Sequence, residues 1–160
     1  MEKKNQAKLD NAIDKISKDI EKFKSKNFVA EKNGKRVYYA SNMEKLPEVT
    51  KELYKTISDK ILSLGPKITK INTKTYLSYK FNKRSFMDIT PFKGQIKVYF
   101  NFTYGELDDK NHIARNVENL GHLGNGDYEV SIKPEEEEKL NHLFELIDQA
   151  YQKFKEIHQF

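Results

Sequence analysis

The stretch from Ile68 to Tyr104 alternates apolar and polar residues with a period of two, the spacing of a strand with one buried face. Turn-rich segments divide it into four predicted strands: Lys67–Asn72, Thr75–Phe81, Ser85–Thr90 and Gln95–Phe102. Because connections this short join antiparallel neighbours, the stretch is expected to fold as an antiparallel meander. In the last of these strands, one set of alternate residues should face a hydrophobic core: Ile96, Val98, Phe100 and Phe102.

Helical patterns lie on both sides of the meander. Pro47 opens a predicted helix that stops at Gly65-Pro66, and its buried face carries Val49, Leu53, Ile57, Ile61 and Leu64. After a further strand with Tyr128, Val130 and Ile132, Pro134 and Glu135 to Glu138 begin a second helix, since acids suit a helix N-terminus. The second helix buries Leu140, Leu143, Phe144, Ile147, Tyr151 and Phe154. The fold class is therefore α+β: one domain with an antiparallel meander of about five or six strands and two main helices packed on one face.

The first 46 residues form an extension to the predicted domain of residues 47–160. Leu9, Ile13, Ile16, Ile20 and Phe23 are spaced 4, 3, 4 and 3 residues apart, which predicts an N-terminal amphipathic helix with a heptad seam. That helix is expected either to dock on its own domain or lead from an upstream one, which is the interpretation we favour, or to pair with a second copy to form a homodimer. Asn33-Gly34 then predicts a tight hairpin, because both central positions need positive φ.

The net charge of +5 conceals two oppositely charged parts of the chain. Residues 1–100 carry 23 Lys and Arg against 11 Asp and Glu, whereas residues 101–160 carry 6 against 13. A field of one sign over the sheet would attract a polyanion such as nucleic acid. The predicted contacts are Lys74, Lys80, Lys83, Arg84, Lys93 and Lys97. The cations are mostly lysine, so a lysine-rich composition without a binding role remains the alternative.

The 160-residue chain has no cysteine, which excludes disulfides and thiolate catalysis. No apolar run approaches the ~20 residues that a membrane span needs. The first residues also lack the apolar core of a signal peptide. We therefore expect a cytoplasmic protein with no membrane partner.

The segment from Tyr104 to Val130 is dense in hydrogen-bonding side chains and poor in apolar ones, as binding loops are. The predicted binding-loop residues are Glu106, Asp108, Asp109, His112, Arg115, His122, Asn125 and Asp127. Asp108, Asp109 and His112, with His122, suggest a metal site, but an acid that caps a short helix ending at Gly121 explains them better. Arg115 and the glycine turn could hold an anion, or Arg115 could pair with Asp127 while His122 satisfies loop carbonyls.

Two further chemistries are weighed. Asp88 followed by Gln95-Ile96-Lys97 resembles the spacing of a metal-dependent nuclease, but a hairpin would place Asp88 opposite Lys97 as an ordinary cross-strand ion pair. The tyrosines among the lysines suggest a stacking platform for bases, or else a half-buried sheet face: Tyr76, Tyr79, Tyr99 and Tyr104. We expect no catalytic residue, no metal and no cofactor, so an enzyme is the less favoured interpretation.

The segments FMDITPFKGQIKVYFNFTYGELDD, IARNV and GHLGNGDYEVSI, in this order, resemble an uncharacterised bacterial domain family often labelled "predicted transport protein". The resemblance covers about Glu48 to Phe154. It implies a companion module that accompanies restriction-endonuclease-like proteins, near nucleic acid and beside an upstream nuclease-type partner. The chain departs from the family pattern at Asn116 and Leu123.

The resulting hypothesis is a non-enzymatic binding module, associated with nucleic acid and linked to bacterial restriction or defence proteins. The alternative is a protein-interaction module that dimerises through the Leu9–Phe23 helix. A metal-dependent nuclease ranks third.

Overall fold

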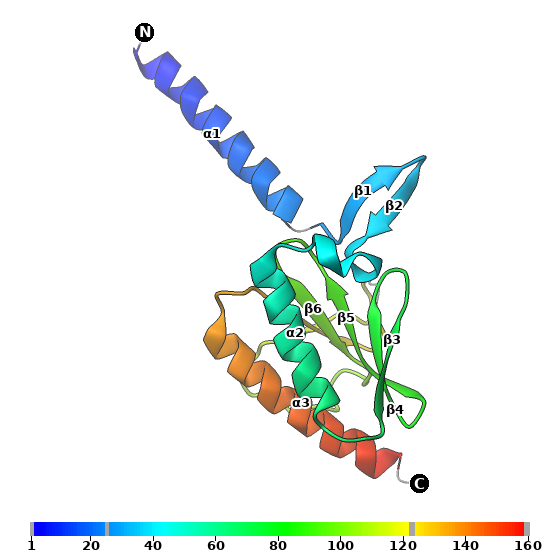
Figure 1. The fold of residues 1–160 in the computed structure, drawn as a ribbon. Coiled ribbons are helices and arrows are strands. Elements are labelled where there is room, and N and C mark those ends of the chain that lie inside the picture. The colour runs from blue at the N-terminus through cyan, green and yellow to red at the C-terminus, as the bar shows by residue number, and fades with distance from the viewer. Residues whose placement is uncertain (1, 25, 122–123, 159–160) are drawn as a thin grey trace.

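The computed structural model describes residues 2–24, 26–121 and 124–158. Its elements, shown in Figure 1, are α1 (Glu2–Lys24), β1 (Phe28–Lys32), β2 (Lys35–Tyr38), the 3-10 turns η1 (Tyr39–Ser41) and η2 (Met43–Lys45), α2 (Glu48–Leu62), β3 (Ile68–Asn72), β4 (Leu77–Phe81), β5 (Arg84–Pro91), β6 (Ile96–Phe100), β7 (Arg115–Asn116), β8 (Tyr128–Ile132) and α3 (Glu137–Ile157). The described chain thus forms the expected α+β fold.

The main sheet has six strands in the order β3-β4-β5-β6-β8-β7, and each neighbouring pair is antiparallel. The first four strands confirm the predicted meander. β8 then pairs with β6, and the two-residue strand β7 forms the outer edge. The four inner strands β4, β5, β6 and β8 are mostly buried, whereas the edge strands β3 and β7 are mostly exposed.

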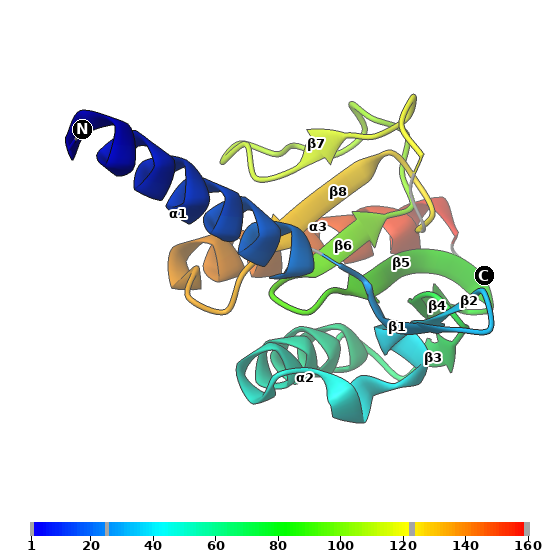
Figure 2. The same cartoon turned by 90° about the horizontal axis from the view of Figure 1, so that it is seen from above.

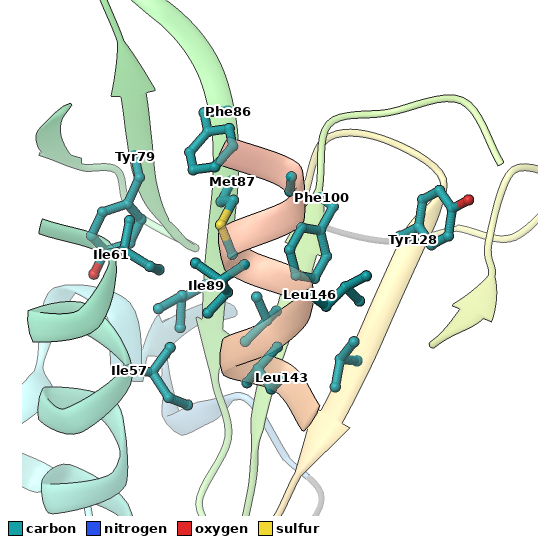
Figure 3. Close-up of a cluster of buried hydrophobic side chains, with 14 of the residues drawn as sticks. Ile57, Ile61, Tyr79, Phe86, Met87, Ile89, Phe100, Tyr128, Leu143 and Leu146 are labelled. Atoms are coloured by element: carbon teal, nitrogen blue, oxygen red, sulfur yellow. The ribbon is translucent and has the colours of Figure 1, made fainter. Parts of the chain in front are cut away.

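Helices α2 and α3 cover one face of this sheet (Figures 1 and 2). Their apolar stripes meet the inward residues of the strands in one core, of which Figure 3 shows Ile57, Ile61, Ile89, Phe100 and Leu143. Ile96, Val98 and Phe100 belong to this core, as their alternation predicts. None of the helices in the described ranges is long and apolar enough to cross a membrane.

Helix α3 begins later than predicted, at Glu137 and not at Pro134. A turn precedes it, in which the Glu136 N–H donates to the Lys133 carbonyl (3.1 Å) and the Lys133 N–H donates to Glu136 Oε1 (2.8 Å). The side chain of Glu136 therefore closes the turn that leads into the helix.

The N-terminal extension contains the predicted hairpin and helix. Asn33 (φ 53°) and Gly34 (φ 76°) both adopt positive φ and join β1 to β2. α1 extends away from the sheet and from the other helices (Figure 1). Leu9, Ile13 and Ile16 are exposed, so the prediction that this seam packs on its own domain is wrong for them. The side chains of Ile20 and Phe23 lie outside the described residues.

The predicted short helix between Asp109 and Gly121 does not form. Both oxygens of Asp109 accept backbone N–H groups, from Ile113 (3.1 Å) and Ala114 (2.9 Å), and His112 adopts a left-handed φ of 52°. A left-handed residue ends a right-handed helix before its first turn is complete. The chain continues into β7, and Arg115 is therefore on an edge strand.

Candidate functional site

The face of the sheet opposite the helices carries a line of polar side chains that crosses five strands. Each of these residues is the cross-strand partner of the next one along the line. We call them the polar row: Ser78, Asp88, Tyr99, Glu129 and Arg115. Asp88 and Glu129 are only 1% and 3% exposed. Two carboxylates with so little access to water require hydrogen-bond donors around them.

Glu129 is the more fully satisfied of the two acids. Its Oε2 accepts the Tyr99 hydroxyl (2.8 Å), its Oε1 accepts Arg115 Nε (2.8 Å), and Lys97 Nζ lies 3.7 Å away. Burial alone would raise the pKa of Glu129, but the bonds from Arg115 and Tyr99 and the charge of Lys97 together lower it. The carboxyl is therefore held in its ionised form, and it fixes Arg115 to the sheet.

Asp88 holds the loop that follows β7. Its Oδ2 accepts both the backbone N–H (2.7 Å) and the side-chain Nδ2 (2.8 Å) of Asn125. Burial raises the pKa of Asp88, against the hydrogen bonds of Asn125 and Ser78 and the charge of Lys80. Within the described residues Asp88 Oδ1 and the buried Thr90 Oγ1 have no hydrogen-bond partner. The acid thus anchors the loop although part of its desolvation stays uncompensated.

The glycines of this loop pass very close to the sheet. A Cβ on Gly124 would lie 2.3 Å from Tyr99 Cδ2, and one on Gly126 would lie 2.0 Å from the Phe100 carbonyl oxygen. Gly126 also has a φ of +89°. These two positions require glycine, and they seat the loop on the sheet at Tyr99 and Phe100.

Most of the predicted binding-loop acids are also committed to the backbone. Glu106 Oε1 accepts the Thr103 N–H (2.6 Å), and Asp127 Oδ2 accepts the Tyr104 N–H (3.0 Å). Glu106 and Asp127 also line a pocket of about 320 Å³ beside Phe154 and His158, near the end of α3. Glu106 and Asp127, from opposite ends of the segment between Tyr104 and Val130, therefore lie at the same pocket. Their side chains are engaged in hydrogen bonds to backbone N–H groups of this segment.

The remaining predicted loop residues have separate positions. Arg115 and Asn125 lie on the polar face, and Arg115 pairs with Glu129, so the suggested pair with Asp127 is wrong. Asp108 is exposed and its backbone is bonded to the Gln149 amide, while His112 is exposed. No group of three or more metal-ligating side chains occurs among the described residues, and His122 lies outside them. The candidate metal site is therefore not assembled by the residues that the structure describes.

The register of the β5–β6 hairpin also differs from the one assumed for the nuclease motif. Asp88 lies opposite Tyr99, and Lys97 lies opposite Thr90, so the expected cross-strand pair of Asp88 with Lys97 is wrong. Lys97 instead approaches Glu129 and the ring of Phe92, 4.9 Å from its centroid. Asp88 meanwhile bonds Asn125, which leaves this acid poorly placed to hold a metal with Gln95.

The predicted nucleic-acid contacts do not form one patch. Lys80 and Lys97 lie near the buried acids of the polar face, and Lys83 and Arg84 lie at the turn between β4 and β5. Lys74 and Lys93 lie at the opposite end of the sheet, in the β3–β4 and β5–β6 turns.

The N-terminal extension adds cations at the end that holds Lys74 and Lys93. The Lys93 N–H donates to the Lys26 carbonyl (2.9 Å), and Ser41 Oγ donates to the Lys74 carbonyl (3.2 Å). Lys26 and Arg36 lie over the ring of Phe28, at 5.4 and 4.6 Å. We call this surface the basic end, and it comprises Lys26, Arg36, Lys74 and Lys93. Lys32 and Lys35 lie farther out, beside the Asn33-Gly34 turn of the hairpin, which points away from the sheet (Figure 1).

The tyrosines proposed as a stacking platform are mostly unable to stack on bases. Tyr79 is fully buried and donates to Ser58 Oγ (2.6 Å), and Tyr99 is 3% exposed within the polar row. Tyr104 is exposed but stacks on Tyr128 at 4.9 Å. An open face of adjacent tyrosine rings is therefore absent from the described sheet. Phe28 and Phe92, which both lie beside cations, are half-buried.

Sequence reasoning missed Glu129 altogether, and it left Tyr99 open between a stacking platform and a half-buried sheet face. A signal for both acids of the polar row was present, because Asp88 in FMDIT and Glu129 in YEVSI each interrupt a strand of large apolar residues. An acid at the centre of such a strand is costly unless it has a specific set of donors.

In a comparison with known protein families, residues 39–153 match the family described as a domain of unknown function, DUF5655. An uncharacterized protein of Haemophilus influenzae is 44% identical over 100 residues, which cover 62% of this chain and 32% of the relative. The chain thus spans about a third of the length of that relative. No solved structure matches.

Proposed function

The chain belongs to the DUF5655 family, and we propose that it is a non-enzymatic module that binds nucleic acid through the basic end. The observation that carries the proposal is the meeting of cations from three separate segments: the hairpin, the β3–β4 turn and the β5–β6 turn. Residues 26–45 carry five cations against two acids, and Lys74 and Lys93 add to them. A phosphate backbone is the partner that such a surface attracts.

The acids of the polar row do not oppose this surface, because they are already paired with Arg115, Tyr99 and Asn125. Other carboxylates do lie at this end of the sheet. Glu31 is 3.8 Å from Arg36, and the acidic start of α3 follows Ile132, which pairs with Ile96 beside the β5–β6 turn. With lysine as the main cation, we expect attraction without strong sequence preference.

The test is fluorescence anisotropy with labelled single-stranded DNA, duplex DNA and RNA of about 20 nucleotides, between about 25 and 200 mM salt. Affinity should fall steeply with salt. The combined variant Lys26→Gln, Lys74→Gln, Lys93→Gln should bind more weakly. Its salt slope on duplex DNA should be lower by about 0.9 for each phosphate that the variant no longer neutralises.

The matched control removes the same charge elsewhere: Lys55→Gln, Lys110→Gln, Lys155→Gln. These lysines lie on α2, after β6 and near the end of α3, away from the basic end. Absence of binding to all three probes at the lowest salt would refute the function. Equal reductions in affinity in both triple variants would refute the location, because net charge alone would then explain the attraction.

The setting among restriction or defence proteins is a further part of the proposal. It is supported by the resemblance in sequence to a family whose members accompany restriction-endonuclease-like proteins. In this setting we expect the chain to bind duplex DNA. A chain that binds RNA alone would contradict this setting and leave the binding function intact.

A further inference from the structure

Helix α1 exposes an apolar seam that no described part of the chain covers. Leu9, Ile13 and Ile16 are 54%, 54% and 58% exposed, and every described side chain between residues 3 and 18 is exposed. The helix extends from the domain over its whole length (Figure 1). Three large aliphatic side chains aligned on one face are a different case from isolated surface leucines, which need no partner.

The helix has little to hold it together by itself. Its described internal side-chain contacts are Gln6 to Asp10 (2.9 Å) and Lys18 to Asp14 (3.3 Å), each of which contributes a few tenths of a kcal/mol. In proteins most of the stability of a helix comes from packing of its amphipathic face and not from the propensity of its residues. A partner that covers the seam would therefore stabilise α1.

The shape of the seam limits what the partner can be. Apolar residues occur at only two positions per seven, which is the narrow stripe of a coiled coil and not the wider stripe of a helix on a globular core. The matching surface is another helix with the same spacing. Ile13 takes the a position, and Leu9 and Ile16 take d positions.

The flanking residues favour a second copy of this chain in parallel register. In that arrangement Asn5 lies beside Asp10 of the second copy, and Ala12 lies beside Ser17. An amide can donate to the carboxylate, and the second pair is small and uncharged, so these flanking pairs bring no like charges together. We propose that α1 forms a parallel two-stranded coiled coil with α1 of a second copy.

This dimer does not depend on nucleic-acid binding, but it bears on it. α1 ends at Lys24, close in sequence to Lys26 of the basic end. A parallel coil therefore brings two basic ends to the same end of the stalk. Two linked surfaces on one polyanion bind more tightly than either alone, because the second contact becomes intramolecular.

The first experiment measures the mass of the full chain by light scattering after size exclusion over a concentration series. The expected result is a species of twice 18.8 kDa at high concentration. Ile13→Asp should raise the dimer dissociation constant about 100-fold or more, since two buried isoleucines are removed per dimer. Asn11→Asp adds the same charge outside the seam and should leave the dissociation constant within about threefold.

The second experiment uses the absence of cysteine from the chain. In a parallel coil each d residue faces its own copy, so Ile16→Cys should form a covalent dimer on mild oxidation. Lys15→Cys, one residue away on the outer face, should react much more slowly. A monomer mass at all concentrations, or equal crosslinking of the two variants, would overturn the proposal. An unchanged thermal transition of Ile13→Asp checks that the domain itself stays folded.

Discussion

Replacement of Glu129 by glutamine tests whether the polar row stabilises the fold as an ionic network. The substitution keeps the shape of the side chain but removes its charge and one of its two acceptor oxygens. The Tyr99 bond (2.8 Å) is buried, and a buried hydrogen bond to a charged group contributes about 1.5–3 kcal/mol. The Arg115 side chain is 59% exposed, so water screens its ion pair, which we count as about 0.5–1 kcal/mol.

We therefore expect Glu129→Gln to lower the free energy of unfolding by about 3 kcal/mol at pH 7. Urea denaturation followed by far-ultraviolet circular dichroism measures it, with an unchanged slope as the sign that the unfolded state is the same. Glu118→Gln is the matched control, because Glu118 is exposed and its side chain bonds only Asn116 among the described residues. Its effect should stay within about 0.5 kcal/mol.

The pH dependence of Glu129→Gln separates a charge effect from a packing effect. The pKa of Glu129 is lowered in the folded protein, so its ionised form contributes stability above its ordinary value of 4.5 and loses it as pH falls toward the folded value. The difference between wild type and variant should be full at pH 7 and shrink in acid. A difference below about 0.5 kcal/mol at pH 7, or one that is constant with pH, would refute the ionic account.

Two other substitutions probe how the loop is seated. Gly126→Ala should lower the free energy of unfolding by about 3 kcal/mol or more, because Gly126 has a positive φ and an added Cβ would clash with the Phe100 carbonyl. The control Gly121→Ala should change it by less than about 0.5 kcal/mol in the same urea assay, because nothing lies within 4 Å of a Cβ there. Asp88→Asn should gain stability relative to wild type as pH rises from 4 to 7, because burial raises the pKa of Asp88 and its ionisation then costs stability above its ordinary value of 3.8. A gap that stays constant across those two pH values in urea titrations would contradict this.

The fold was largely predictable because its elements have clear periods. Alternation in residues 68–104 specified four strands, and the spacing of three or four residues between apolar side chains specified most of the buried faces of α2 and α3. Val49 is the exception: it was predicted to be buried but is 60% exposed, in the first turn of α2. The prediction failed at Asp109, where a residue typical of a helix cap instead bonds two successive N–H groups of a tight turn. Local sequence cannot distinguish these outcomes, because both use a short acid that accepts backbone donors.

The polar row was not predictable to the same degree, because it depends on register between strands distant in sequence. A shift of two residues in β6 would place Lys97 opposite Asp88, as the hairpin prediction had it, and would break the row. The four residues between Pro91 and Ile96 set the actual register, which puts Tyr99 there. Glu129 joins only through β8, which arrives after the long loop.

The polar side chains of the segment from Tyr104 to Val130 are therefore mostly engaged in hydrogen bonds within the fold. Glu106, Asp109 and Asp127 accept backbone N–H groups, and Arg115 and Asn125 bond buried acids. A side chain whose donors or acceptors are engaged in this way can recognise a ligand only if it breaks an internal bond, at a cost of about 1–3 kcal/mol. The cations of the basic end lie outside this segment. Any nucleic-acid binding should then follow charge and salt, and substitutions in the segment should act first on stability and only through it on affinity.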